Sequence, residues 1–551
     1  MKKSKNIIIA ITLVIASVIS YSFYDGYFEV SKNLDVFSSL FKEINQKYVD
    51  EPNPGKLIEN AINGMLDNLD PYTNFISESD IEDVRFMTTG QYGGIGSLIQ
   101  QRGDYVIISE PYEGFPACKA GLIPGDKILE VDGLSTKGKK TADISAILKG
   151  QPGTTIKLKI ERDGLVINKE LVREEIKIDN IPYYGLLKQN VAYIKLTGFT
   201  DNAGSEVKDA LLKLKSQANL TGVILDLRGN GGGLLRESVN IANIFVKKGQ
   251  EIVNTKGRLK EGTSTHATHE NPVDLEIPLV ILVDRGSASA SEIVSGSMQD
   301  LDRAVIIGQR TYGKGLVQNV FPLTYNTQVK ITIAKYYTPS GRCIQAIDYA
   351  NRNEDGSVGK IPDSLITAFK TKNGRIVYDG GGIAPDISIE PEKMSEIAIS
   401  LIMKNLIFDY ATKFVKENKS IASADKFQIT DDMYNSFVAY LSDKDYDYQT
   451  RSEQIIEDFK KTASEEKYFE RVEKEFDQLK QKLAHNKNED LMTFKKQIKS
   501  ILKEEIISRY YYQKGRIITN LFEDPEVDKA IEVINNKSLY QSILDGTFKA
   551  K

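Results

Sequence analysis

The residues of this chain best suited to covalent chemistry are a serine cluster and a lysine that follows it. The cluster, Ser287 to Glu292, comes directly after the apolar run Ile277 to Val283. Ser289 should therefore stand at a turn between a buried strand and a helix. Lys314 lies farther along, between two glycines. A serine hydroxyl and a neutral lysine amine can serve as nucleophile and general base, which predicts acyl transfer without histidine.

Ser289 admits two interpretations from spacing alone. A helix N-terminus offers unpaired N–H groups and a partial positive charge, which would stabilise an oxyanion. Ser289 and Glu292 also match the S/T-x-x-E capping box, in which the serine only closes the helix. The spacing by itself favours the cap.

Lys314 favours catalysis if its pKa falls. A lysine acts as a base at neutral pH only when its pKa drops from about 10.4 toward 7. This drop means that the charged form is disfavoured by roughly 4 kcal/mol, which burial of the amine can supply. Gly313 and Gly315 would let the backbone approach another segment closely. Gln318 could orient the amine, but on an extended strand it would lie about 13 Å away, so a turn or a separate strand must close the gap. The alternative is a solvated lysine in a glycine-rich turn.

A glycine run supplies a third chemical element. Asp226 to Gly233 follows another apolar run and contains three consecutive glycines, Gly231 to Gly233. Adjacent glycine N–H groups can converge on the oxyanion of an acyl transfer. Glycine runs also simply reverse the chain, so this pattern is weak when taken alone.

Two further patterns resemble ligand sites. Gly308 to Lys314 nearly matches a phosphate-binding loop, but Gly315 replaces the Ser or Thr that binds magnesium, and a strand pattern follows. His266, His269 and Glu270 suggest zinc, yet they lie in a polar, threonine-rich stretch without a further ligand at matching spacing. We therefore expect neither a metal nor a cofactor.

The elements that must position these residues change character along the chain. Residues 26–90 are predicted to be helical, because apolar residues recur at three- and four-residue spacing. Residues 91–173 show short β-like runs with tight turns at Asp132-Gly133 and Asp163-Gly164, which predicts a small β-rich domain. Strands and helices alternate over 174–390, as in an α/β layer with parallel buried strands. Residues 391–551 have the composition of long helices and a candidate surface for homo-oligomerisation.

Charge and the N-terminus bound the location and partners of the protein. The 551 residues carry a formal net charge of −4, which gives no basic field for nucleic acid. Met1 to Lys5 is positively charged, and Ile7 to Tyr24 is uncharged and mostly apolar. We expect residues 1–25 to be a signal anchor or signal peptide in the membrane. The flanking lysines stay in the cytoplasm. The rest of the chain should then lie on the periplasmic side of the inner membrane, anchored or released after signal cleavage.

Several separated motifs together resemble the C-terminal processing peptidases, or tail-specific proteases, of the S41 serine peptidase family. The likeness covers about residues 35–390 and rests on motifs that occur in the same order: Leu69 to Thr73, Tyr92 to Gly96, Ala120 to Leu122, Pro124 to Asp126, Asp226 to Gly233, Ser287 to Glu292 and Tyr312 to Gly315. The chain departs from the pattern at Asn230-Gly231, where many members have Asn-Pro, and this should leave the glycine N–H groups available. The resemblance implies a multidomain α/β protein, with an α/β serine-peptidase core, an inserted PDZ-like domain and helical regions at both ends.

The resemblance also implies a role for each candidate residue. Ser289 would be the nucleophile, Lys314 the general base, and Gln318 the residue that assists the lysine. The N–H of Ala290 and that of Gly233, or of Gly232 as second choice, would form the oxyanion hole. Asp300 matches an acidic position implicated in some members. In the PDZ domain, Gly94, Ile95 and Gly96 match the loop that binds a substrate's C-terminal carboxylate.

The expected function is a serine endopeptidase that cleaves protein substrates near their C-terminus by a Ser/Lys dyad, with the PDZ domain binding the tail. One alternative is an inactive PDZ scaffold that binds tails without cleaving them. Another is an ATP-dependent enzyme that uses the Gly308 to Lys314 loop.

Overall fold

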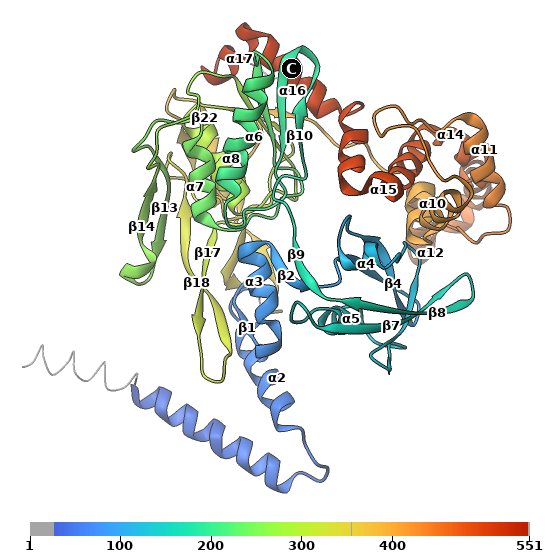
Figure 1. Ribbon diagram of the computed structural model, residues 1–551, viewed down its shortest axis with the longest axis horizontal. Helices are drawn as coiled ribbons and strands as arrows, with labels where there is room; N and C mark the ends of the chain where they lie inside the picture. Colours follow the sequence, from blue (N-terminus) through green and yellow to red (C-terminus); the bar gives the residue numbers. More distant parts are fainter. Residues whose placement is uncertain (1–26, 354, 549–551) are drawn as a thin grey trace, which may run out of the picture. The chain divides into compact units, whose positions relative to one another are not determined.

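The computed structural model describes residues 27–353 and 355–548 (Figure 1). The predicted export segment, residues 1–25, lies outside them. The described chain divides into two units: one runs to Phe75 and includes Val329–Ile331, and the other contains Ile76–Gln328 and everything from Thr332 onward. Across the described residues, no helix combines the length and the apolar character needed to cross a membrane.

The first unit is mainly helical, as predicted, and it also contains most of strand β1 (Asn74–Ile76) and three residues of a later strand. Residues 27–47 form a helix, and α2 (Pro54–Leu66) follows the predicted break. Asn53 caps α2, because its side chain accepts the N–H of Lys56, and Pro54 fills a first-turn position where no N–H is needed.

A six-stranded sheet forms the centre of the second unit. Its order is β10 (Tyr183–Leu186), β11 (Val191–Lys195), β12 (Gly222–Asp226), β15 (Leu279–Val283), β16 (Val305–Gly308) and β23 (Ile387–Ser388). Neighbours from β11 to β23 are parallel, and only β10 pairs antiparallel, at one edge. The predicted alternation with parallel, buried strands is confirmed. Parallel order matters for the site, because it brings the carboxyl ends of β12, β15 and β16 to one edge.

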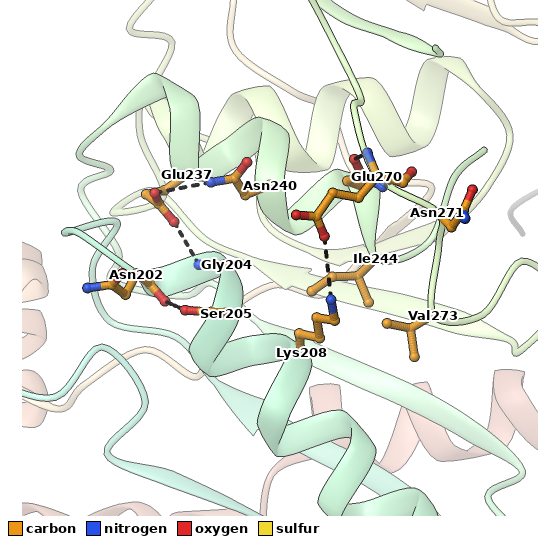
Figure 2. A pocket seen from close by; sticks show the side chains of 11 residues that line it. Asn202, Gly204, Ser205, Lys208, Glu237, Asn240, Ile244, Glu270, Asn271 and Val273 are labelled. Atoms are coloured by element: carbon orange, nitrogen blue, oxygen red, sulfur yellow. Dashed lines mark hydrogen bonds and ion pairs between the residues drawn. The ribbon is translucent and has the colours of Figure 1, made fainter. Parts of the chain in front are cut away.

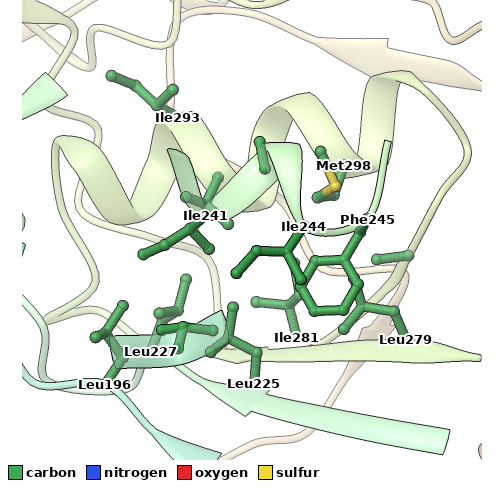
Figure 3. Close-up of a cluster of buried hydrophobic side chains, with 14 of the residues drawn as sticks. Leu196, Leu225, Leu227, Ile241, Ile244, Phe245, Leu279, Ile281, Ile293 and Met298 are labelled. Atoms are coloured by element: carbon green, nitrogen blue, oxygen red, sulfur yellow. The ribbon is translucent and has the colours of Figure 1, made fainter. Parts of the chain in front are cut away.

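Three helices cover one face of this sheet. They are α6 (Ala203–Gln217), α7 (Leu235–Asn243) and α8 (Ala290–Asp300). Figure 3 shows the core between helices and sheet, where Ile241, Phe245 and Met298 meet Leu225 and Ile281. All five side chains are almost completely buried, so this packing fixes α8 against the strand ends.

The opposite face is covered by the far C-terminus of the chain. Helices α16 (Pro525–Asn535) and α17 (Lys537–Leu544) pack against the sheet. Val527, Ala530 and Val533 join Ile224 and Val280 in one buried cluster. Residues that composition placed only in a C-terminal helical region therefore complete the peptidase-like core.

A second sheet of this unit lies beside α8. Strand β13 (Glu251–Gly257) pairs antiparallel with β14 (Ser264–Ala267) on one side and with β18 (Gln328–Tyr337) on the other, and β17 (Leu316–Pro322) pairs with β18. Strand β14 has a single strand neighbour among the described residues.

The predicted β-rich domain forms a sheet in the order β3 (Ser97–Arg102), β4 (Tyr105–Pro111), β5 (Lys127–Val131), β7 (Thr155–Arg162), β8 (Leu165–Val172), with β6 (Leu134–Ser135) on β5. Helix α4 (Pro116–Lys119) and helix α5 (Thr141–Leu148) accompany it. The predicted turns are confirmed: Asp132 and Gly133 lie between β5 and β6, and both have positive φ. Strands β2 (Gln91–Gly94) and β9 (Glu174–Lys177) pair where the chain enters and leaves the domain.

The remaining elements include the predicted helical region, which has its own buried core. They are α3 (Ile81–Thr89), β19 (Ile347–Arg352), β20 (Val358–Lys360), β21 (Ala368–Lys370), β22 (Ile376–Tyr378), α9 (Glu396–Met403), α10 (Leu406–Glu417), α11 (Asp431–Tyr440), α12 (Arg451–Glu465), α13 (Glu473–Leu483), α14 (Lys487–Thr493) and α15 (Lys495–Leu521).

Candidate active site

One cleft of about 580 Å³ brings the predicted residues together. Ser289, Lys314 and Gln318 line it, and so do Gly231 and Gly233 of the glycine run. The glycine run, Ser289 and Lys314 lie in the segments that follow β12, β15 and β16, so the parallel sheet places these three segments at one edge, and Gln318 lies just beyond them on β17. The cleft is where the sequence predicts the chemistry.

Ser289 stands at a strained turn between β15 and α8. Its backbone has φ 55° and ψ −113°, which is costly for a residue other than glycine. Its N–H donates to the Glu292 side chain (2.9 Å), so the predicted capping box is present at the start of α8. Ser289 therefore caps the helix and at the same time lines the cleft.

Glu292 ties the serine turn to the lysine loop. Its Oε2 accepts the N–H groups of Ser289 and Lys314, both at 2.9 Å. Its Oε1 accepts the Thr311 hydroxyl (2.6 Å) and the Gly313 N–H (2.7 Å). The carboxyl is fully buried, and burial raises its pKa to about 7, although these four hydrogen bonds favour the charged form. Glu292 thus holds together the two backbones that carry the predicted dyad.

We predict that Glu292→Gln lowers the rate of peptide cleavage at least tenfold, which corresponds to the free energy of roughly one buried hydrogen bond. The reason is that the NH₂ group of the glutamine would face two backbone or side-chain donors whose hydrogen bonds a carboxylate oxygen now accepts. The pKa of Glu292 rises from 4.5 to about 7 on folding. Its contribution to stability, about 3 kcal/mol, is therefore present below pH 4.5 and lost as pH rises through 7. Thermal unfolding at pH 5 and pH 8 should show this loss in the wild type and not in the variant. Parallel pH dependence in both proteins would contradict the assignment.

The lysine loop approaches a neighbouring segment closely, as its glycines predict. A Cβ on Gly313 would lie 2.4 Å from the Cβ of Ala346, and one on Gly315 would lie 2.8 Å from the N of Gln345. Gly315 also donates its N–H to the Gln345 side chain (2.7 Å). Lys314 comes before β17 instead of on it, so Gln318 on the strand can share its cleft. The Gln318 amide donates to the Thr332 hydroxyl on β18 (3.1 Å). A strand follows the loop, and not the helix that a phosphate-binding loop requires.

Asn230 joins the glycine run to the serine turn. Its carbonyl accepts the N–H of Ala288 (3.0 Å) and the hydroxyl of Ser291 (2.8 Å). Its side chain accepts the N–H of Gly232 (2.9 Å) and donates to the Leu196 carbonyl (2.9 Å). Because Asn230 is fully buried, these bonds fix the run against the residues that flank Ser289.

The predicted oxyanion donors differ in how their N–H groups are used. The Gly232 N–H donates a hydrogen bond to the Asn230 side chain, so it is not available to an oxyanion. The N–H groups of Ala290 and Gly233 donate to no protein acceptor within the described residues. A Cβ on Gly232 would lie 2.9 Å from the Ala290 N and 2.8 Å from the Ser289 Cβ, so the glycine backbone rests directly on the serine turn.

A buried charge cluster anchors the start of the glycine run. The Asp226 carboxylate accepts from the Tyr193 hydroxyl (2.7 Å) and from Lys195 (3.0 Å), and it pairs with Arg228 (2.6 Å). Burial would raise the pKa of Asp226, but Lys195 and Arg228 hold it well below its usual range. Arg228 also pairs with Asp524 and Glu526 at the start of α16. The C-terminal helices are therefore tied to the residues just before the glycines.

Asp300 lies at the far end of α8 and is absent from the residues that line the cleft. Its carboxylate pairs with Arg342 (2.8 Å) and accepts the N–H of Ser340 (3.0 Å). Both charged side chains are almost fully buried. In this structure Asp300 holds the segment after β18 to α8.

In the predicted carboxylate-binding loop, two backbone carbonyls accept hydrogen bonds from other residues of the same domain. The Ile95 carbonyl accepts the N–H of Ala117 (2.8 Å), and the Gly96 carbonyl accepts that of Tyr112 (2.9 Å). Gly96 has φ +70° and lies against Phe115 so closely that a Cβ would come within 2.5 Å. The N–H groups of Ile95 and Gly96 have no protein acceptor in the part of the chain that the structure describes. Gly94 ends β2 directly before them.

Another pocket lies between α6, α7 and the loop before β15 (Figure 2). Glu237 in it accepts the N–H of Gly204 (2.8 Å) and the amide of Asn240 (3.1 Å), and Lys208 approaches Glu270 (3.4 Å). These polar groups already hold one another, and none of the predicted catalytic residues lines this pocket. These contacts hold α6, α7 and the loop before β15 together, which is a structural role.

The histidine motif separates in space. His266 lies on β14 and lines the large cleft, whereas the exposed His269 donates its N–H to the side chain of Asn243, which lines the other pocket. Among the described residues, no group of three His, Cys, Asp or Glu side chains could hold a metal ion.

Sequence reasoning overlooked the two residues that connect the site. Glu292 was visible only as the last residue of the capping box, and Asn230 only as part of a glycine-rich turn. Their burial and their partners across loops decide their roles, and neither can be read from local spacing.

Comparisons with known proteins agree with this geometry. Residues 190–351 match peptidase family S41, residues 107–162 match a PDZ domain, and residues 397–534 match the C-terminal helical domain of PDZ-proteases. The match to a carboxy-terminal-processing protease of Bartonella bacilliformis is 37% identical over 321 residues, which is 57% of this chain and 73% of that protein. The carboxy-terminal processing protease CtpA of Bacillus subtilis is 28% identical over 471 residues, 82% of this chain and 98% of the relative.

Among solved structures, the photosystem II D1 C-terminal processing protease is similar, with 28% identity and a TM-score of 0.36 over 64% of this chain and 87% of that one. The sequence matches and the assembled cleft lead to one conclusion. This chain is a serine peptidase and belongs to peptidase family S41, among the carboxy-terminal-processing proteases.

Proposed function

We propose that this peptidase cleaves protein substrates near their C-terminus through an acyl-enzyme formed on Ser289, with Lys314 as general base. The convergence of Ser289, Lys314 and the glycine run on one cleft carries the proposal. The contacts of Glu292 support it, since this side chain accepts N–H groups from both the serine turn and the lysine loop and so holds the base loop beside the nucleophile.

The mechanism would proceed in two halves. The Ser289 Oγ attacks the peptide carbonyl carbon while the Lys314 amine takes its proton, and the N–H groups of Ala290 and Gly233 hold the oxyanion. The C–N bond then breaks, and the leaving amine takes the proton from Lys314. Water attacks the resulting ester while Lys314 again accepts the proton; the ester C–O bond then breaks, and the Ser289 Oγ takes that proton back from Lys314. Gln318, held by Thr332 in the same cleft, would orient the amine.

The PDZ domain would bind the substrate tail. Strand β3 is an edge strand, so an extended peptide can add to the sheet there. Helix α5 lies beside β3, where the Thr141 hydroxyl donates to the Gln101 side chain (3.3 Å). The N–H groups of Ile95 and Gly96, just before β3, have no protein acceptor among the described residues and would donate to a terminal carboxylate.

Tail recognition is tested with a pair of substrates that differ only at the C-terminal group. We expect the protein with a free carboxylate to be cleaved at least tenfold faster than its amidated twin, because the donor pair then loses a charged acceptor worth about 1.5–3 kcal/mol. Mass spectrometry of the products gives the cleavage sites and rates. Equal cleavage of both would remove the tail from the mechanism. Tight binding of the free tail with no cleavage at all would favour the inactive-scaffold alternative.

The same proposal locates the active site outside the cytoplasm. The lysines of Met1 to Lys5 and the apolar run Ile7 to Tyr24 support export behind a signal anchor or signal peptide. Added protease should then reach the folded domains in spheroplasts with a sealed inner membrane. Protection of these domains in such spheroplasts would contradict this location.

A further inference from the structure

His266 lines the catalytic cleft without any role in the proposed mechanism. It lies on β14, the strand at the edge of the second sheet, and its side chain is half-buried. Ser264, two residues earlier on the same strand, also lines the cleft. Successive residues of a strand point to opposite faces, so Ser264 and His266 share one face.

Strand register shows which way that face is turned. Thr255 lies opposite both Ser264 and Tyr336 in antiparallel pairs, so the three side chains share a face. The Tyr336 hydroxyl donates to the carbonyl of Ser289 (3.1 Å). The face that carries His266 is therefore the one turned toward the nucleophile.

The spacing of the strands separates His266 from the bond that reacts. Neighbouring strands lie about 4.8 Å apart, so β14 is about 10 Å from β18, the strand of Tyr336. A side chain at that distance does not reach the scissile carbonyl beside Ser289. It can reach the side chain of a substrate residue near that carbonyl.

The exposed Ser264 bonds to the Thr255 hydroxyl through its backbone, and within the described residues neither its hydroxyl nor the His266 imidazole has a hydrogen bond, ion pair or ring contact with the protein. Burial lowers the pKa of His266, so its ring is neutral at pH 7 and offers one donor and one acceptor. The charged groups that line the cleft are Arg236, Glu261 and Lys314, which include both signs. The rest of the lining mixes apolar side chains, such as Leu235 and Ile293, with the polar Thr255.

We propose that His266, with the Ser264 hydroxyl beside it, is a specificity determinant that hydrogen-bonds an uncharged polar substrate side chain, such as Thr, Ser or Asn, close to the scissile bond. The inference rests on the proposed function, because it assigns part of the substrate to that cleft. Such a site rejects a substrate with an apolar side chain at this position. The apolar side chain would cover the polar groups of His266 and Ser264 without forming hydrogen bonds to them.

The test uses peptides made from a mapped cleavage site, in which each of the residues flanking the scissile bond is in turn Thr or its isostere Val. For the wild type we expect one position where Thr is preferred about five- to tenfold in kcat/KM, the worth of one hydrogen bond. In His266→Leu this ratio should fall to about one. His266→Gln keeps a donor and an acceptor, and should keep most of the preference. His269→Leu, a change three residues along at an exposed position outside the cleft, should leave the ratio unchanged.

Two outcomes would overturn the inference: no position with a Thr preference in the wild type, or an unchanged ratio in His266→Leu. An unchanged ratio with slower cleavage of both peptides would mean that His266 only supports the fold. Failure of the proposed function looks different, since the wild type would then give no cleavage site from which the peptides could be made.

Discussion

Replacing Lys314 with methionine is expected to slow acyl-enzyme formation by about 10²–10⁴-fold, the usual contribution of a positioned general base. Ser289→Ala should reduce turnover at least as far, because no covalent intermediate can then form. Both side chains line the cleft and neither is fully buried, so the fold should tolerate both changes. Stopped-flow release of a fluorescent leaving group measures the step, and thermal unfolding checks the fold.

Lys314→Arg distinguishes a base from a mere positive charge. Arginine keeps the charge and much of the length of lysine, but it does not lose its proton in proteins. If Lys314 works as a base, the arginine variant should be as slow as the methionine variant. Recovery of more than about a tenth of the wild-type rate in the arginine variant would show that charge, and not proton transfer, is what Lys314 contributes.

The catalytic cleft was predictable where local pattern and parallel topology suffice. Apolar runs before Asp226 and Ser289 predict buried strands, and the ends of parallel strands meet at one edge, so the glycine run and the serine turn had to converge. The glycines around Lys314 predicted a close approach to another segment. Only the structure identifies that segment as Gln345 and Ala346.

What the sequence did not reveal depends on partners far along the chain. Glu292 accepts hydrogen bonds from two loops, and a capping pattern does not predict the second. Helices α16 and α17 look like ordinary charged helices by composition, although their apolar stripe covers the second face of the core sheet. The ion pairs of Arg228 with Asp524 and Glu526 link those helices to the catalytic edge. Such contacts need the tertiary fold, because nothing in local spacing fixes them.

Gly232→Ala is expected to lower kcat by about 10²–10³-fold, the usual loss when an oxyanion donor is displaced. Gly232 has φ +100°, and an added Cβ would lie 2.7 Å from the Ala288 carbonyl, 2.8 Å from the Ser289 Cβ and 2.9 Å from the Ala290 N. Two of these atoms are backbone atoms and the third is a Cβ, so none can rotate away, and the serine turn or the glycine run must move. Either movement separates the N–H groups of Ala290 and Gly233 from the serine that they would serve.

Two neighbouring glycines serve as matched controls for this effect. Gly231 has open space around it and does not lie in the left-handed region, so Gly231→Ala should change kcat less than about twofold. Gly229 has φ +70° and also open space, so Gly229→Ala carries the backbone strain of about 1–2 kcal/mol without the collision. Comparing kcat and thermal unfolding across the three variants separates strain from displacement. If Gly232→Ala folds and keeps kcat within about threefold of Gly229→Ala, its contact with the serine turn does not set the oxyanion geometry.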